Sequence, residues 1–278
     1  MNKITSKKLS SFQTFLIEQE RSCATVEKYI RDVKCFLSYL GERDISKQIL
    51  LDYKSYLAER YAVSGANSMI AALNCFLRFC SLHKLCIKQF RVQRQAYCSE
   101  EKELCKEEYF RLLAAANKRG NSRLNLIIQT ICGTGIRVSE LQYITVEAVQ
   151  NGEAIVNCKG KNRRIFIVPE LKKKLLRYVK EQNITCGAVF VTRRGKPISR
   201  NSIWKEMKSL CAEANVAPSK VFPHNLRHLF ARTFYSIEKD IAKLADILGH
   251  SSINTTRIYI ITTGAEHKRK MENMHLII

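Results

Sequence analysis

The sequence lacks the features of an exported, zinc-binding or membrane protein. Its eleven cysteines are odd in number and scattered, and no two of them form a C-x-x-C pair. This pattern argues against a disulfide framework and a zinc site, and it favours reduced thiols in a cytosolic protein. No segment approaches the roughly 18 uninterrupted apolar residues that a membrane-spanning helix needs. We therefore expect a protein that is neither exported nor inserted in a membrane.

Glycine and proline are scarce in the first part of the chain. Only Gly41 and Gly65 precede Gly120, and all four prolines follow residue 168. Because both residue types interrupt helices, their scarcity predicts a helical first hundred residues. Apolar side chains there recur at the three- to four-residue spacing of amphipathic helices. The predicted helices cover residues 7–19, 25–41 (capped by Thr25), 49–61 (after Ser46) and 67–85.

The helical periodicity is lost near residue 86, and it resumes after residue 102. We predict a four-helix domain over residues 1–86, a linker over residues 87–102 and a second domain over residues 103–278. The helices predicted in the second domain cover residues 106–120, 122–135, 169–182, 199–215, 223–236 and 240–250. Two short strands, 153–158 and 164–169, are predicted around a turn at 159–163. The expected fold class is mainly α, an all-α domain followed by an α+β domain with a small antiparallel sheet.

The chain carries a large excess of positive charge. Lysine and arginine number 47 against 25 aspartates and glutamates, so the net charge is +22, while 46% of the residues are hydrophobic. A folded protein with so strong a field is expected to bind a polyanion, with nucleic acid as the first candidate and an anionic membrane surface as the second. Residues 1–98 carry +8 and residues 99–278 carry +14. Two basic domains joined by a linker suggest a clamp that closes on a DNA duplex.

Four short segments of the second domain carry the residues with chemical potential. They are GTGIRVSEL at 133–141, NCKGKNRR at 157–164, HNLRH at 224–228 and LGHSSINTTRIY at 248–259. The residues that we single out are Arg137, Lys159, His224, Arg227, His250 and Tyr259. Taken alone, each has an ordinary explanation, such as a solvated lysine in a turn. A metal pair of His224 and His228 is disfavoured, because no acidic or cysteine partner lies at ligand spacing.

Together these six residues suit the cleavage of a phosphodiester without a metal ion. Two guanidiniums can hold the non-bridging oxygens and stabilise the charge that builds on a pentacoordinate phosphorus. A tyrosine hydroxyl is a weak nucleophile until a base or a cationic field activates it, and histidine and lysine can move the protons. A covalent phosphotyrosine would keep the energy of the broken bond, so rejoining would need no ATP. We expect no cofactor.

The segments GTGIRVSEL, HNLRH and LGHSSINTTRIY resemble the three hallmark boxes of the tyrosine recombinases, also called the phage integrase family, in their short two-domain, Xer-like form. The resemblance covers nearly the whole chain. It implies a helical core-binding, SAM-like DNA-binding domain followed by an integrase-like catalytic domain. It also implies that Arg137, His224 and Arg227 hold the scissile phosphate. His250 then hydrogen-bonds the same phosphate, and Tyr259 is the nucleophile that forms the 3′-phosphotyrosine.

The resemblance further implies that Lys159 is the general acid toward the 5′-hydroxyl leaving group. Its position before Gly160 matches the family's Gly-Lys-Gly pattern, although Cys158 stands where glycine is usual. Lys161 in the same turn is the alternative. A second departure follows the nucleophile, where residues 260–261 are Ile-Ile and the family commonly has Thr-His. This departure concerns local packing rather than chemistry.

Two neighbours of the six residues are interpreted as structural. His228 follows Arg227 directly and is taken to be a structural histidine. Glu140 is expected to support the helix of Arg137 rather than to act as a base.

The resemblance also implies stepwise strand exchange between two DNA duplexes through a Holliday junction. The expected assembly is a homo-oligomer, a tetramer on two DNA sites, with a second recombinase or an accessory factor as a further partner. Residues 265–278 would form a tail that docks on a neighbouring subunit, although a frayed terminus fits the same residues. Because the helices begin close to Met1, we expect no arm-binding domain ahead of them. The expected localisation is cytoplasmic and nucleoid-associated.

Three rival functions are weighed against this interpretation. A non-catalytic DNA-binding protein is disfavoured because all six chemical positions hold competent residues. A type IB topoisomerase uses a similar constellation for relaxation alone, but the Xer-like layout argues against it. A metal-dependent DDE transposase lacks a carboxylate triad in this sequence. Integration, excision, inversion and resolution all use the same tyrosine chemistry on different sites.

Overall fold

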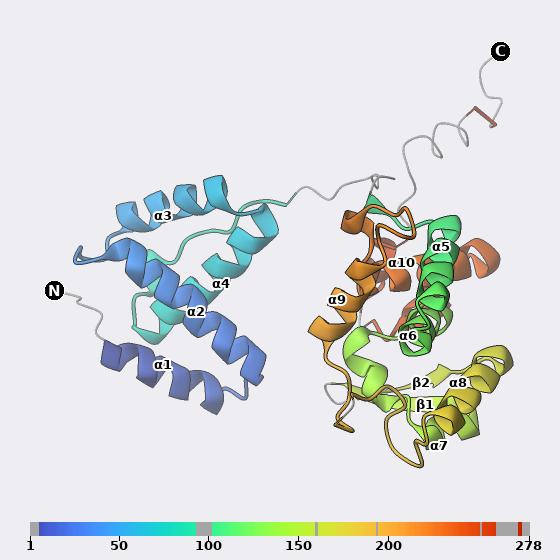
Figure 1. Ribbon diagram of the computed structural model, residues 1–278. Helices are drawn as coiled ribbons and strands as arrows, with labels where there is room; N and C mark the ends of the chain where they lie inside the picture. Colours follow the sequence, from blue (N-terminus) through green and yellow to red (C-terminus); the bar gives the residue numbers. More distant parts are fainter. Residues whose placement is uncertain are drawn as a thin grey trace. The chain divides into compact units, whose positions relative to one another are not determined.

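The computed structural model describes residues 6–92, 102–158, 161–192, 194–250, 252–259 and 272–273 (Figure 1). The chain divides into two compact units, residues 1–94 and residues 95–278. Within the described residues the elements are helices apart from one two-stranded sheet, so the expected fold class is confirmed. No helix of this described part is both long and apolar enough to cross a membrane.

The described part of the first unit is a bundle of α-helices. These are α1 (Ser6–Glu18), α2 (Cys23–Leu40), α3 (Lys47–Arg60) and α4 (Val63–Phe79), followed by the 3-10 turn η1 (His83–Leu85). Their apolar stripes meet around fully buried aromatic residues, which include Phe12, Phe36, Tyr53 and Phe76. Burial of such large side chains is the main favourable term for a bundle of this size.

Several helix boundaries in the first unit differ from the prediction, and α4 begins at Val63 rather than at residue 67. Helix α2 begins at Cys23, and Ser22 rather than Thr25 occupies the N-cap position. The fourth predicted helix, residues 67–85, is interrupted because Ser81 adopts a left-handed φ of 60°. The backbone N–H of Leu82 then donates to Leu77 O at 2.8 Å, which closes the end of α4. A non-glycine residue seldom takes this conformation, so the sequence contains no signal for the break.

Residues 87–90, which we predicted to begin the linker, are held against α4 instead. The side chain of Asn74 donates to Ile87 O at 2.8 Å and accepts from Ile87 N at 2.9 Å. Asn67, two helical turns earlier, makes the same pair of bonds with Phe90, at 3.0 and 2.7 Å. Each amide thus pairs with an extended backbone as a neighbouring strand would. Ile87 is only 4% exposed, so this segment belongs to the first unit.

Replacement of Asn74 by alanine is expected to lower the free energy of unfolding by about 2 kcal/mol, because it leaves buried backbone groups of Ile87 without partners. Asn67→Ala is the matched control, since the same two bonds are lost at a half-buried position and water can replace them. Urea unfolding of the full chain, followed by circular dichroism, compares the two variants. Equal losses would contradict a special role for the buried amide.

The second unit contains more elements, most of them helical. They are α5 (Lys106–Lys118), α6 (Ser122–Thr134), η3 (Val138–Tyr143), α7 (Val146–Asn151), β1 (Glu153–Cys158), β2 (Lys161–Phe166), α8 (Pro169–Glu181), α9 (Arg200–Ser209), η4 (Pro218–Lys220), α10 (Pro223–Glu238), α11 (Ile241–Leu248) and α12 (Ile253–Arg257). Helix α6 contributes many of the buried side chains of the core, and α5, α8 and α10 pack against it. The short helices α7 and α12 were not predicted, because a helix of five or six residues shows too little periodicity.

The sheet of the second unit is an antiparallel hairpin whose register corrects the prediction. Cys158 pairs with Lys161, so β2 begins three residues earlier than the predicted strand at 164–169. Only residues 159 and 160 separate the strands, the loop length of the tightest hairpins. These two residues lie outside the described ones, and so does Lys159 with them.

Candidate active site

Three arginine side chains from other parts of the second unit donate hydrogen bonds to backbone carbonyls at the end of α11. Arg163 of β2 donates to Ile247 O at 2.5 Å, and Arg227 of α10 donates to Leu248 O at 2.7 Å. Arg137, which precedes η3, donates to Gly249 O at 3.3 Å. Three consecutive carbonyls at the end of one helix thus each accept from a different guanidinium. These carbonyls form the negative end of the helix dipole, which favours cations.

Two glycines allow the close approach of these elements. Gly249 ends α11 in the left-handed conformation with φ +63°, and a Cβ there would lie 2.5 Å from Cδ of Arg163. Gly135 ends α6 in the same conformation, and a Cβ would lie 2.5 Å from the ring of Phe230. Both positions therefore require glycine, because φ is positive and because a Cβ would collide with a neighbouring side chain.

Glu140 is the carboxylate that holds two of the three arginines. Its side chain is buried, and it accepts from Arg137 Nη1 at 2.8 Å and from Arg163 Nη2 at 2.5 Å. It also accepts from the backbone N–H of Arg137 at 2.9 Å. Burial raises the pKa of Glu140, but the bonds from Arg137 and Arg163 outweigh it and leave the pKa below its ordinary value. Glu140 is therefore an anionic support for Arg137, in agreement with the role expected from the sequence.

Arg227 is buried in the middle of the site, with an exposed fraction of 1%. Its guanidinium donates to Gly135 O, to Leu248 O and to His250 Nε2, the last at 3.0 Å. Because arginine has no acceptor, His250 Nε2 must be the lone-pair nitrogen in this bond. The proton of a neutral His250 then lies on Nδ1, which is 2.9 Å from the hydroxyl of Thr256.

Tyr259 lies at the end of α12 and is only 5% exposed. Its hydroxyl is 3.5 Å from His224 Nε2, and its ring stacks on His250 with the centroids 5.4 Å apart. The ring of His228 is nearer still, at 4.4 Å between centroids. Three histidine rings from two segments therefore enclose the phenol. The other side of Tyr259 packs on a small apolar cluster with Leu244 and Leu248.

Burial and the neighbouring cations lower the pKa of two histidines, His224 and His250, so both are neutral at neutral pH. The pKa of His224 is lowered to about 4 by burial first and then by His228, Arg227 and Arg137. The pKa of His250 is also lowered to about 4, by burial first and then by Arg227 and Arg137. Burial and then Arg137 lower the pKa of Arg227 to about 10, so this guanidinium stays charged. A neutral His224 beside a hydroxyl is able to accept a proton.

The structure thus brings together five of the six residues singled out in the sequence. Contacts link Arg137, Arg227, His250, Tyr259 and His224 through the end of α11. The sixth residue, Lys159, lies outside the described residues.

Three further residues contribute to the site and were not predicted from the sequence. They are Arg163, Thr256 and Glu103, which contact Glu140, His250 and His228 respectively. Strand register would have revealed Arg163, since it pairs with the buried Val156.

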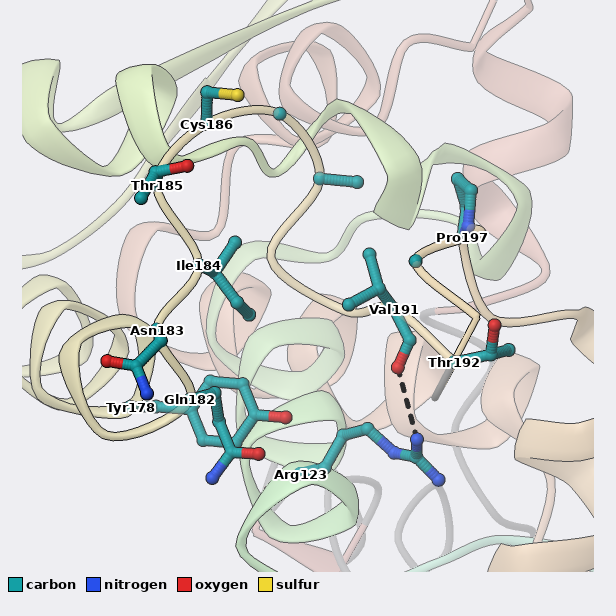
Figure 2. A pocket seen from close by; sticks show the side chains of 13 residues that line it. Arg123, Tyr178, Gln182, Asn183, Ile184, Thr185, Cys186, Val191, Thr192 and Pro197 are labelled. Atoms are coloured by element: carbon teal, nitrogen blue, oxygen red, sulfur yellow. Dashed lines mark hydrogen bonds between the residues drawn. The ribbon is translucent and has the colours of Figure 1, made fainter.

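A cavity of about 610 Å³ lies elsewhere in the second unit and contains none of these residues. Arg123, Tyr178 and several residues between Gln182 and Pro197 line it, and Figure 2 shows Arg123 donating to Val191 O. That bond is 3.1 Å long, and a second one to Glu206 measures 2.9 Å, so internal acceptors already engage this guanidinium. Among the described residues, no group of three or more His, Cys, Asp or Glu side chains could hold a metal ion.

The fold and the site define a class of protein. The described residues are mainly helical, and two arginines, two neutral histidines and a tyrosine lie together in the site. Phosphoryl transfer to a tyrosine uses groups of these kinds. The sequence model of the phage integrase family matches residues 102–265, more than half of the sequence. The chain belongs to the phage integrase family, and the resemblance to tyrosine recombinases is confirmed.

Individual relatives agree with this assignment. Tyrosine recombinase XerD of Halalkalibacterium halodurans is 28% identical over 294 residues, covering 96% of this chain and 97% of that protein. Tyrosine recombinase XerA of Pyrococcus furiosus is 26% identical over 283 residues, covering 99% and 96%. A lambda integrase tetramer bound to a Holliday junction superimposes with a TM-score of 0.74 at 17% identity, covering 93% of this chain and 78% of that one.

Substitution of Gly249 by alanine is expected to destabilise the protein by two additive effects. The left-handed φ costs about 1 kcal/mol for a residue with a Cβ, and the clash with Arg163 costs roughly 1 to 3 kcal/mol more. Gly152→Ala is the matched control, because Gly152 also ends a helix in the left-handed conformation and a Cβ there meets nothing within 4 Å. Urea unfolding of both variants isolates the second effect. Equal losses would show that the contact with Arg163 does not constrain position 249.

Proposed function

We propose that this chain cleaves and rejoins DNA at a specific site through a covalent 3′-phosphotyrosine on Tyr259. The observation that supports the proposal most directly is the 3.5 Å approach of the Tyr259 hydroxyl to His224 Nε2, beside the buried guanidinium of Arg227. A nucleophile, a neutral acceptor for its proton and a fixed cation therefore occupy one small volume. The net charge of +22 supplies the field that attracts a DNA backbone.

The chemical step follows from the roles of these groups. The Tyr259 oxygen forms a bond to the scissile phosphorus while His224 takes the phenolic proton. Arg137 and Arg227 hold the non-bridging oxygens and stabilise the charge of the transition state. The bond from phosphorus to the 5′-oxygen breaks, and Lys159 gives that oxygen a proton. Attack by a 5′-hydroxyl on the phosphotyrosine reverses the step and reseals a strand, so no external energy is used.

His250 is proposed to change its hydrogen-bonding role when the phosphate binds. In the structure its Nε2 accepts a bond from Arg227, and in this tautomer it cannot donate to a phosphate oxygen. The partner on the other side of the ring is the Thr256 hydroxyl, which can either donate or accept. If Thr256 donates to Nδ1, the proton of His250 moves to Nε2 and faces the phosphate. Thr256 therefore supports both tautomers without movement of the ring.

The assembly is proposed to be a homo-oligomer that binds double-stranded DNA, with a tetramer acting on two DNA sites. Support comes from lambda integrase, which has the same fold and forms a tetramer on a Holliday junction. A second recombinase or accessory factor, and cytoplasmic, nucleoid-associated localisation, stay predictions from the sequence. The tail at residues 265–278, apart from residues 272–273, lies outside the described residues, and its docking role also stays a prediction.

Covalent trapping tests the assignment of the nucleophile. The full chain is incubated with a pool of nicked duplexes that have randomised centres, so that the cleaved strand cannot be resealed, and adducts are isolated on denaturing gels. We expect wild-type protein to form an adduct and Tyr259→Phe to form none, because only the hydroxyl is removed. Sequencing of the trapped strands identifies the preferred site, which then serves as a defined substrate.

Tyr235→Phe is the matched control for this experiment. Tyr235 lies on α10 beside the same apolar cluster as Tyr259, and it is also partly buried. It should form adduct at the wild-type rate. An adduct in Tyr259→Phe, or no adduct with wild-type protein on a duplex that it binds, would refute the proposed function. Relaxation of supercoiled DNA without sequence preference would favour a type IB topoisomerase instead.

The leaving-group lysine is tested with a sulfur substitution. A 5′-bridging phosphorothiolate at the scissile position leaves as a thiolate and needs no proton, so it bypasses a missing general acid. Lys159→Ala is expected to slow cleavage of ordinary DNA by about a hundredfold and to cleave the sulfur substrate at close to the wild-type rate. Lys161→Ala is the matched control and should show no such rescue. Rescue of Lys161→Ala alone would assign the general acid to Lys161.

A further inference from the structure

Three residues on one side of α10 hold the start of the second unit's described chain. Asn225 donates to Lys102 O at 2.9 Å, and Arg232 donates to Leu104 O at 2.6 Å. Between them, the carboxylate of Glu103 meets His228. Positions 225, 228 and 232 are spaced by three and four residues, so they lie along one face of the helix. The same helix carries His224 and Arg227 of the candidate active site.

The carboxylate of Glu103 bridges two residues of α10. Its Oε1 lies 3.5 Å from His228 Nδ1, and its Oε2 lies 3.2 Å from Arg232 Nη2. The side chains of Glu103 and His228 are 13% and 14% exposed, so water competes little for this contact. At 3.5 Å and without the geometry of a hydrogen bond, this contact is electrostatic, and it favours the ring orientation that keeps Nδ1 beside the carboxylate.

Of the three histidine rings around Tyr259, the ring of His228 is the nearest. The centroid of its ring is 4.4 Å from that of Tyr259, compared with 5.7 Å for His224 and 5.4 Å for His250. It also packs edge-on against His224 at 4.8 Å. A rotation of the His228 ring would therefore displace both the nucleophile and the group that faces its hydroxyl.

We propose that Glu103 is a positioning residue for strand cleavage, which acts by fixing His228 against Tyr259 and His224. The proposal rests on the proposed function, since it takes Tyr259 as the nucleophile. Neither Glu103 nor His228 is assigned a contact with the phosphate. Misplacement of reacting groups by a fraction of an ångström to one ångström slows a reaction strongly without weakening the binding of its substrate.

A double-mutant cycle tests this coupling in the full-length protein. The substrate is the defined suicide duplex selected by covalent trapping, and the two measured quantities are its Kd and the single-turnover rate of adduct formation. Glu103→Ala is expected to slow adduct formation about tenfold at an unchanged Kd. His228→Phe keeps a ring of similar size but removes Nδ1, and it is expected to be slow as well. The double variant should be no slower than His228→Phe, because Glu103 acts through that residue.

Two further variants serve as a control and as a substitute for Glu103→Ala. Glu213→Ala removes a partly exposed carboxylate that pairs with Arg119 in the same unit, and it should leave the cleavage rate unchanged. Glu103→Gln keeps an acceptor oxygen and replaces Glu103→Ala in the test if the alanine variant does not fold. It should slow cleavage at least about threefold at an unchanged Kd.

Three outcomes would overturn the proposal. They are a wild-type rate in Glu103→Ala, a wild-type rate in Glu103→Gln where alanine does not fold, and independent effects that multiply in the double variant. Failure of the proposed function looks different, because Tyr259→Phe would then still form adduct or the wild-type protein would form none.

Discussion

The carboxyl end of α11 is the feature on which the arrangement of the site depends. Its last three carbonyls accept from Arg163, Arg227 and Arg137, which come from β2, α10 and the segment before η3. Three guanidiniums in one small volume repel one another, so they stay together only where fixed negative charge or dipoles offset the repulsion. The helix end and the single carboxylate of Glu140 provide that compensation. Positive charge remains in excess, and a bound phosphate is the group that would neutralise it.

This excess charge explains the states of the other groups. His224 and His250 lie among arginines, and their pKa values are lowered to about 4, so both are neutral at neutral pH and His224 is able to accept a proton from Tyr259 in the proposed reaction. A protonated histidine in the same position would hold the phenol but could not deprotonate it. The cationic cluster thus has two functions in the proposed reaction. It attracts the phosphate, and it keeps the proton acceptor in the basic form.

The sequence was sufficient for the periodic and the chemical parts of the structure, but insufficient for its long-range contacts. The apolar stripes predicted the long helices, and five residues singled out by their chemistry lie together in the fold. Arg163 was missed because the predicted turn at 159–163 included it, whereas the strand begins at Lys161 and pairs Arg163 with the buried Val156. Glu103 was missed because its partner His228 lies far along the chain. The break at Ser81 was missed because it depends on a backbone angle that serine seldom adopts.

The proposed nucleophile and the arginine beside it are both buried, and this bears on how a phosphate reaches them. Tyr259 is 5% exposed and Arg227 is 1% exposed, so little of either side chain is accessible to a phosphate while their present contacts persist. The bond between Arg227 and His250 occupies a donor that the phosphate would use, and the histidine rings enclose the phenol. In the proposed reaction, access of a phosphate to Tyr259 would therefore involve a shift of α12 or of the residues packed on it. The binding energy that aligns the scissile phosphate with the proposed nucleophile is the source of free energy for such a shift.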